Sequence, residues 1–122
     1  MPKKILVVDD ERGMVELLKD NLEARNYLVS TASDGRGALE KALNETPDLI
    51  LLDILIPGLD GFEVLRRLRH SVPTSQTPVI IISAKRESTF ILAAQHLGAT
   101  DYLIKPLSMK SLLALVRKQL WE

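Results

Sequence analysis

Short apolar runs alternate along this chain with longer segments in which apolar residues recur at helical spacing. The runs at residues 5–8, 49–52 and 79–82 are continuous, and weaker runs occur at residues 27–32 and 102–104. Continuous runs of this length are typical of strands that are buried on both faces of a parallel sheet. Helical periodicity covers residues 11–25, 37–43, 61–70, 88–97 and 108–120.

Strand and helix therefore alternate five times along the chain. Parallel strands that are joined by helices need right-handed crossovers, which place helices on both faces of the sheet. The turn-rich stretch at residues 71–78 joins a helix to a strand, so it does not divide the chain. The pattern predicts one α/β domain with a five-stranded, doubly wound parallel sheet.

Composition excludes several classes of function. Lys and Arg together number 16, as do Asp and Glu, so no overall positive field exists to drive direct nucleic-acid binding. Cysteine is absent, which excludes disulfides and thiolate sites. No apolar run approaches the roughly 18 residues of a membrane span, and the N-terminus does not resemble a signal peptide. We therefore expect a cytoplasmic domain that contacts no membrane.

Polar side chains stand where the predicted strands end. Asp9 and Asp10 follow the first apolar run, Asp53 the third, Ser83 the fourth and Lys105 the fifth. Ligands of open α/β sheets bind beyond these carboxyl ends. Asp53 also lies among apolar neighbours, where an isolated carboxylate would be costly without compensation.

Three carboxylates at one edge of a sheet repel each other unless a cation joins them. Oxygen ligands with no His or Cys nearby favour a hard divalent ion, Mg²⁺ first. A lysine adds a positive charge for a further anion, and a serine adds a hydrogen-bond donor. This set suits a phosphoryl group held next to Mg²⁺.

These residues, with DILIPGLDG at residues 53–61 and LGATDYLIKP at residues 97–106, closely resemble the response-regulator receiver domain of two-component signalling. The resemblance covers nearly the whole chain and implies a flavodoxin-like fold with strand order 2-1-3-4-5, for which the chemotaxis receiver is a known example. It implies a single receiver domain over residues 1–122, either standing alone or excised from a longer protein.

The resemblance also implies a role for each acidic residue. Asp53 would be the phosphoacceptor, receiving its phosphoryl group from a sensor histidine kinase, a phosphotransfer protein or a small phosphodonor such as acetyl phosphate. Asp10 and Asp53 would bind Mg²⁺ directly and Asp9 mostly through water. The backbone carbonyl of Leu55 would complete the protein ligands, and Mn²⁺ could replace Mg²⁺. Such a domain catalyses only its own phosphorylation and dephosphorylation and is not otherwise an enzyme.

The remaining site residues would sense the phosphoryl group. Lys105 would pair first with Asp53 and then with a phosphoryl oxygen, while Ser83 would move in to hydrogen-bond that group. Tyr102 would follow as an aromatic switch that passes from exposed to buried. In this family the bond between Lys105 and Pro106 is usually cis.

The fourth predicted helix carries more apolar residues than one buried face needs. We therefore expect Phe90 or Ile91 to face outward, near Tyr102 on the next strand. In receivers the surface of the fourth helix, fifth strand and fifth helix reads out activation. This predicts an apolar contact site for a homodimer or an effector. Thr100 replaces an acid that is common in charged receiver dimers, which argues against that particular dimer.

Other interpretations explain fewer residues. A Mg²⁺-dependent phosphatase of the haloacid-dehalogenase type also uses an aspartyl phosphate, but it needs a second aspartate two residues after the first, where this chain has Leu55. The pair Asp9 and Asp10 could simply cap a helix, and a binding module without phosphorylation is a third reading.

Asp60 is expected to be a helix N-cap. Leu55 is apolar and cannot orient an attacking water, which favours slow self-dephosphorylation.

Overall fold

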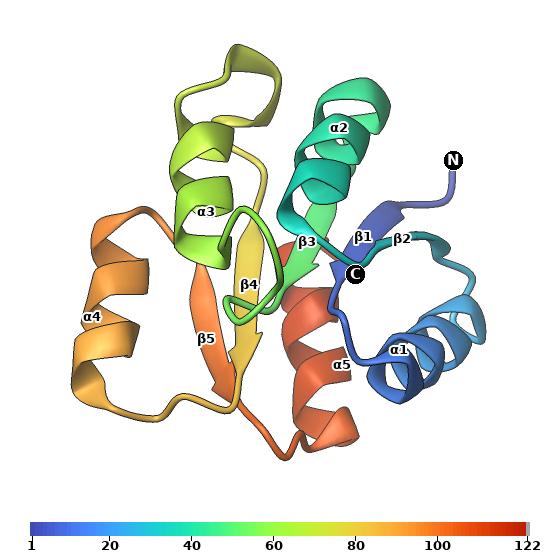
Figure 1. Cartoon of the computed structure of the whole chain (residues 1–122). Coiled ribbons are helices and arrows are strands. Elements are labelled where there is room, and N and C mark those ends of the chain that lie inside the picture. The colour runs from blue at the N-terminus through green and yellow to red at the C-terminus, as the bar shows by residue number, and fades with distance from the viewer. Residues whose placement is uncertain (122) are drawn as a thin grey trace.

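Figure 1 shows a computed structural model of the chain, which describes residues 1–121. Strands and helices alternate in the order that the sequence predicts. The elements are β1 (Lys4–Val8), α1 (Arg12–Glu23), β2 (Leu28–Ala32), α2 (Gly35–Glu45), β3 (Leu49–Leu52), α3 (Gly61–Arg69), a short 3-10 helix (Val72–Thr74), β4 (Val79–Ser83), α4 (Ser88–His96), β5 (Asp101–Ile104) and α5 (Met109–Gln119).

The five strands form one parallel sheet in the order β2-β1-β3-β4-β5. Ile5 of β1 lies opposite Leu49 of β3, and Ile50 of β3 lies opposite Val79 of β4. All residues of β3 and β4 are buried, whereas the edge strands β2 and β5 are only half-buried. The weaker apolar runs in the sequence therefore correspond to the two edges of the sheet.

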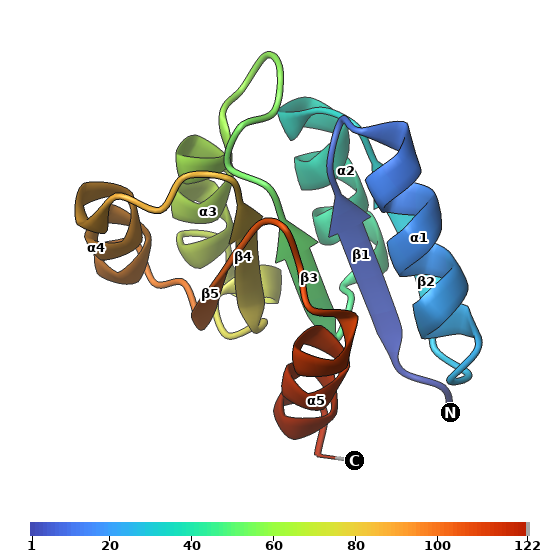
Figure 2. The ribbon, with the colours of Figure 1, turned by 90° about the horizontal axis from the view of Figure 1, so that it is seen from below.

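Helices cover both faces of the sheet, as the view in Figure 2 shows. Alternate side chains of each inner strand point to opposite faces. Leu6 and Val8 of β1 therefore join the core under α2, α3 and α4, while Ile5 and Val7 join the core under α1 and α5. The doubly wound architecture with strand order 2-1-3-4-5 is confirmed. Among the described residues, no helix is both long and apolar enough to cross a bilayer.

The first residues of the helices were predicted with unequal accuracy. α2 begins at Gly35, two residues before the predicted start, because the Asp34 carboxylate caps the helix and accepts the Gly37 N–H at 2.7 Å. Asp60 caps α3 in the same way, as expected, and accepts the Glu63 N–H at 3.0 Å. The N-cap residue of α1 is Glu11, which makes no side-chain capping hydrogen bond, and Asp9 accepts the N–H of Glu11 rather than one from α1.

The apolar surface of α4 differs in one respect from the expectation. Phe90 and Ile91 are both half-buried, and the Phe90 ring stacks on Phe62 with 6.1 Å between ring centroids. Leu92, which the sequence reading did not single out, is 61% exposed. The outward apolar residue of this helix is therefore Leu92, because α4 turns its Phe90 side toward α3.

Candidate functional site

Two buried carboxylates stand at the carboxyl ends of neighbouring inner strands. The backbone N–H of Asp53 donates to the Val8 carbonyl at 2.9 Å, and the N–H of Asp9 donates to the Ala32 carbonyl at 3.1 Å. These bonds extend the sheet by one step and hold each aspartate against the adjacent strand. Asp9 is 3% exposed and Asp53 is 5% exposed, whereas Asp10 faces solvent.

Lys105 joins the two carboxylates. Its Nζ lies 2.9 Å from Asp9 Oδ2 and 3.0 Å from Asp53 Oδ2. The second oxygen of each aspartate accepts a backbone N–H at 2.9 Å, from Glu11 for Asp9 and from Leu55 for Asp53. The lone carboxylate of the apolar run is thus compensated by one cation and one backbone donor.

The charge of this lysine is stabilised by its partners. Burial alone would lower the pKa of Lys105, but the hydrogen bonds to Asp9 and Asp53 and their negative charges raise it above its usual value. Lys105 is therefore a permanent cation at neutral pH. Its side chain is 16% exposed, so its charge is held beside the carboxylates.

The acidic residues also have the chemistry of a metal site. Asp9, Asp10 and Asp53 each offer an oxygen, and these three oxygens all lie within 4.8 Å of one another. A set made only of oxygen ligands suits Mg²⁺, and the exposed Asp10 suits an ion that keeps several of its waters. The donor set therefore fits the ion that the sequence predicts. The structure also puts the backbone of Leu55 beside Asp53 through the N–H bond described above.

Ser83 and Tyr102 meet at one residue of the loop after β4. Ser83 is fully buried, and its Oγ accepts the Lys85 N–H at 3.1 Å. The Tyr102 hydroxyl donates to the Lys85 carbonyl at 2.6 Å, and burial raises the pKa of Tyr102. The Lys105 N–H donates to the Ser83 carbonyl at 2.8 Å, so the two residues are adjacent at the strand ends. The bond between Lys105 and Pro106 is cis, the isomer that the resemblance implies.

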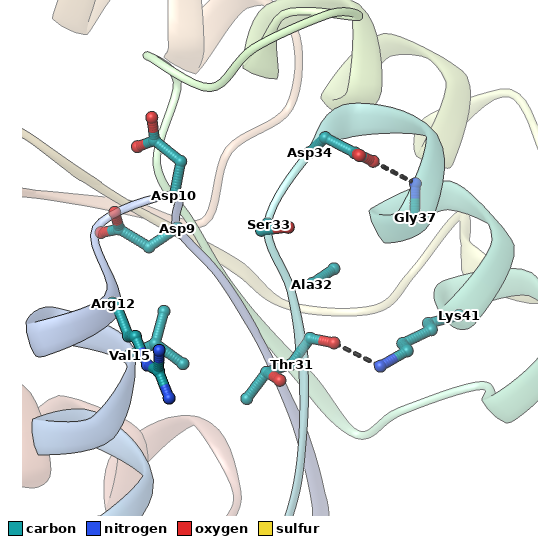
Figure 3. A pocket seen from close by; sticks show the side chains of 10 residues that line it. All are labelled: Asp9, Asp10, Arg12, Val15, Thr31, Ala32, Ser33, Asp34, Gly37 and Lys41. Atoms are coloured by element: carbon teal, nitrogen blue, oxygen red, sulfur yellow. Dashed lines mark hydrogen bonds between the residues drawn. The ribbon is translucent and has the colours of Figure 1, made fainter.

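A cavity of about 450 Å³ adjoins the acidic residues and was not anticipated from the sequence. Figure 3 shows Asp9 and Asp10 on one side of it and the end of β2, the following loop and α2 on the other. On that second side, Lys41 of α2 donates to the carbonyl of Thr31 in β2. Ser33 and Asp34 follow the second apolar run just as the other polar residues follow theirs. The position of Ser33 and Asp34 after an apolar run could have indicated this cavity, but the run at residues 27–32 is only weakly apolar and predicts a strand end poorly.

Comparison with known proteins extends these observations. The profile of the response regulator receiver domain matches residues 5–117. The chain is 48% identical over 117 residues to the alkaline phosphatase synthesis transcriptional regulatory protein PhoP of Bacillus subtilis, and 42% identical over 117 residues to the response regulator ArlR of Staphylococcus saprophyticus. These alignments cover 96% of this chain but only 48% and 52% of the relatives, so the chain spans about half of their length.

Solved structures give the same result over nearly the whole chain. The chemotaxis protein CheY4 of Vibrio cholerae is 30% identical with a TM-score of 0.91, covering 97% of this chain and 98% of that one. The BeF3-activated receiver domain of Klebsiella pneumoniae RstA is 31% identical with a TM-score of 0.90, covering 98% and 99%. This chain belongs to the response regulator receiver domain family, whose members are phosphorylation-activated switches of two-component signalling.

Proposed function

We propose that Asp53 is the phosphoacceptor of this receiver domain. An oxygen of its carboxylate would attack the phosphorus of a phosphohistidine on a sensor kinase or phosphotransfer protein. A P–O bond forms as the donor P–N bond breaks, and the electron pair of that bond leaves with the imidazole ring, which takes up a proton. The observation that carries this proposal is the buried Asp53 carboxylate at the end of the central strand, in contact with Lys105 and close to two further acids.

Asp9, Asp10, Asp53 and the backbone carbonyl of Leu55 would hold Mg²⁺, with Mn²⁺ as a substitute. When bound, the ion would neutralise charge on the phosphoryl oxygens. The oxygen-only donor set supports this assignment. So does a related structure, the receiver domain of the sensor histidine kinase PA1611 from Pseudomonas aeruginosa, which has a magnesium ion coordinated in its active-site cleft. That domain is 25% identical to this chain, with a TM-score of 0.91 and full coverage of both.

Phosphorylation would then redistribute the contacts of Lys105 and Ser83. It adds about two negative charges and three acceptor oxygens to Asp53. Lys105, which now bonds the carboxylate at 3.0 Å, would move to a phosphoryl oxygen, and the Ser83 hydroxyl would donate to another. Ser83 and Tyr102 both form a hydrogen bond with the backbone of Lys85, in the loop after β4. A shift of the Ser83 hydroxyl would therefore move this loop and change its hydrogen bond to the Tyr102 hydroxyl. This is a two-state shift driven by local charge.

The surface of α4, β5 and α5 would carry the output. Phe90, Ile91 and Tyr102 would contact a second copy of the domain or an effector, and Leu92 adds exposed apolar area to the same helix. The relative PhoP is a transcriptional regulatory protein, and any DNA contact would belong to the part of such a protein beyond this domain. Ile91→Ser should weaken association of the activated form without slowing phosphorylation, which sedimentation with and without beryllofluoride would measure. Unchanged association would contradict this surface.

The domain would act on itself and turn over no external substrate. Leu55 occupies the position where a haloacid-dehalogenase-type phosphatase needs an acid, and this residue is 46% exposed. An apolar side chain there cannot orient a water toward the acyl phosphate. We therefore expect a long-lived phosphoryl group, and a decay within seconds of removing the donor would contradict this expectation.

The decisive experiment is incubation with acetyl phosphate and Mg²⁺, followed by mass spectrometry of the intact protein. The wild type should gain one phosphoryl group only when Mg²⁺ is present, and Asp53→Asn should gain none. Asp60→Asn is a matched control, because asparagine keeps the capping interaction that Asp60 makes at the start of α3. A modification that survives in Asp53→Asn would overturn the assignment of the phosphoacceptor.

A further inference from the structure

The loop between β3 and α3, residues 54–60, lies against the first residues of two helices. α2 begins at Gly35 and α3 begins at Gly61, and each glycine follows an aspartate that caps its helix. The same Asp–Gly start therefore occurs twice in the chain. Both glycines are buried, although helix starts are ordinarily exposed.

Both glycines approach the backbone of this loop more closely than any side chain allows. A Cβ on Gly61 would lie 2.3 Å from Ile54 Cα and 2.9 Å from the Asp53 carbonyl oxygen. A Cβ on Gly35 would lie 2.0 Å from the Leu59 carbonyl oxygen. Real Cβ atoms essentially never approach other heavy atoms below 3.0 Å, so a larger residue at either position must displace the loop, the start of the helix or both.

The contacts made by Gly61 and Gly35 lie at opposite ends of the loop that follows Asp53. Gly61 touches its beginning, where its N–H also donates to the Ile54 carbonyl at 3.1 Å, and Gly35 touches its end at Leu59. Between them, Leu55 is nearly half exposed, Gly58 has a φ of 74°, and Ile56 is buried in the core under α2 and α3. The glycine contacts at the two ends therefore act together with the Ile56 side chain to hold the loop in place.

We propose that Gly35 and Gly61 are positioning residues for the phosphorylation site. By allowing the two helix starts to close on the loop from opposite ends, they hold the Asp53 carboxylate and the Leu55 carbonyl where the metal and the phosphoryl group need them. This inference rests on the proposed function of the same site. Misplacing a reacting group by about 1 Å can cost on the order of 100-fold in rate.

A variant of Gly35 can test the positioning role, because Gly35 itself does not touch the metal ligands. It lies on α2, makes none of the described hydrogen bonds to Lys105 or the aspartates of the site, and meets the loop at Leu59. A methyl group at this position adds no charge and removes no ligand. Any loss of metal affinity in Gly35→Ala must therefore arise from movement of the backbone, and the loop amides report whether the loop is the part that moves.

The test compares Gly35→Ala with two matched glycine variants. Gly13→Ala places its methyl group in open space on α1, and Gly37→Ala, also on α2, meets side chains rather than backbone, with Asp34 Oδ1 at 3.1 Å and Ala32 Cβ at 3.7 Å. Mg²⁺ titrations of the full chain, followed by NMR, give the dissociation constant, and spectra recorded without Mg²⁺ report the loop amides directly. Urea unfolding is measured in parallel for each variant.

In Gly35→Ala we expect shifted amide resonances of the loop residues without Mg²⁺, and Mg²⁺ affinity reduced by about 10- to 100-fold, the usual effect of disturbing residues that orient metal ligands. Gly13→Ala and Gly37→Ala should bind Mg²⁺ as the wild type does. A folded Gly35→Ala protein with wild-type affinity and unshifted loop amides would overturn the inference.

Leu59→Gly covers the case in which Gly35→Ala does not fold. This variant removes the Leu59 Cβ that lies against Gly35 and frees the backbone at the end of the loop without a clash, so we expect it to weaken Mg²⁺ binding several-fold. Unchanged affinity in Leu59→Gly would overturn the inference even if Gly35→Ala were unfolded. If the wild type itself showed no response to Mg²⁺, the proposed metal site would fail, and that outcome is distinct from a failure of positioning.

Discussion

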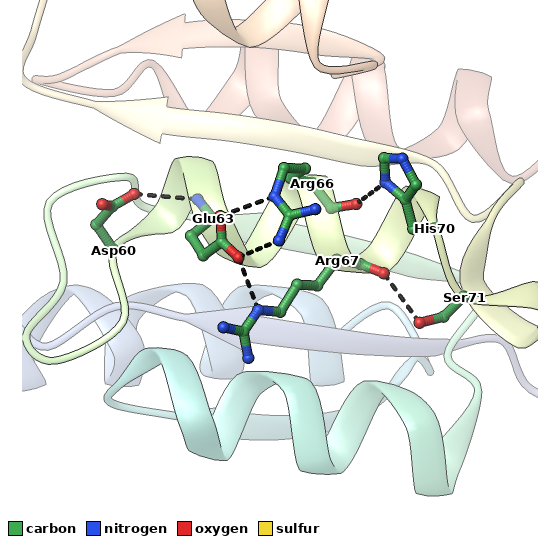
Figure 4. A network of polar contacts seen from close by, with 6 residues as sticks. All are labelled: Asp60, Glu63, Arg66, Arg67, His70 and Ser71. Atoms are coloured by element: carbon green, nitrogen blue, oxygen red, sulfur yellow. Dashed lines mark hydrogen bonds and ion pairs between the residues drawn. The ribbon is translucent and has the colours of Figure 1, made fainter.

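Two ionic clusters of this domain have similar geometry and opposite surroundings. At the strand ends, one cation, Lys105, contacts two carboxylates at 2.9 and 3.0 Å. On α3, one carboxylate, Glu63, contacts two cations, with 2.8 Å to Nε of Arg66 and 2.7 Å to Nε of Arg67, as Figure 4 shows. The first cluster is nearly enclosed by protein, whereas the two arginines on α3 are about half exposed.

Burial, rather than distance, separates the roles of these clusters. On α3 the hydrogen bonds from Arg66 and Arg67 lower the pKa of Glu63 to about 2, but water and salt can replace either partner of an exposed pair. At the strand ends little water is available to replace Lys105, so its loss would leave two carboxylates without a counter-charge. Arg66 and Arg67 thus lie on a solvated face of α3, while the buried cluster is the proposed site of phosphorylation.

Removing the buried cation should have the largest effect on stability. Lys105→Met is expected to lower the free energy of unfolding by about 3 kcal/mol at neutral pH, since it leaves Asp9 and Asp53 buried without a cation. Mg²⁺ should restore part of this loss, because it binds the folded site and not the unfolded chain. Urea unfolding with and without Mg²⁺ measures both effects. Lys110→Met, which removes an exposed lysine of α5, is the control, and an equal loss in both variants would contradict the comparison.

Alkaline pH should weaken the buried cluster without mutation. The folded-state pKa of Lys105 is raised above 10.5, so its pairing contributes full stability below pH 10.5 and loses it as the pH rises through the folded value. The stability difference between wild type and Lys105→Met should therefore shrink above that pH. Unfolding curves for both proteins across the alkaline range would measure it. A constant difference would mean that the charge of Lys105 is not the source of its stabilisation.

Tyr102→Phe tests a contact of intermediate burial. It removes the hydroxyl that donates to the Lys85 carbonyl at 2.6 Å and keeps the partly buried ring packed against the core. We expect a loss of about 1 kcal/mol in the free energy of unfolding, the usual value of one hydrogen bond. The rate of phosphorylation by acetyl phosphate should stay unchanged, because the hydroxyl contacts neither Asp53 nor Lys105 among the described hydrogen bonds. A slower reaction would show that the tyrosine acts on the site itself.

Glu63→Gln should have the smallest effect of the four. The lowered pKa means that Glu63 contributes its pairing above pH 4.5 and loses it as the pH falls through about 2, so at neutral pH the variant removes the full charge of the pair. Even so, we expect the urea midpoint at high salt to remain within the reproducibility of the measurement, because the pair is exposed and screened. A loss as large as that of Lys105→Met would show that burial does not rank these clusters.

Much of the site could be predicted because all strands of a parallel sheet end at the same edge, so residues far apart in the sequence become neighbours there. Asp9, Asp53, Ser83 and Lys105 each follow an apolar run, and parallel strands bring such positions to one edge. The Asp60 cap was predictable because capping depends only on neighbours along the chain. The start of α2 and the polar residues after β2 were missed, because an edge strand is less apolar and its ends are harder to recognise.

The sequence by itself determined the alternation of strands and helices, the family, and the edge of the sheet at which the chemistry lies. These depend on local periodicity and on the order of residues along the chain. Only the tertiary structure decided that Leu92, rather than Phe90, is the exposed apolar residue of α4, and that Gly35 touches the loop beside Asp53. Such contacts depend on how each helix is rotated and seated on the sheet, which is set by packing between residues far apart in sequence.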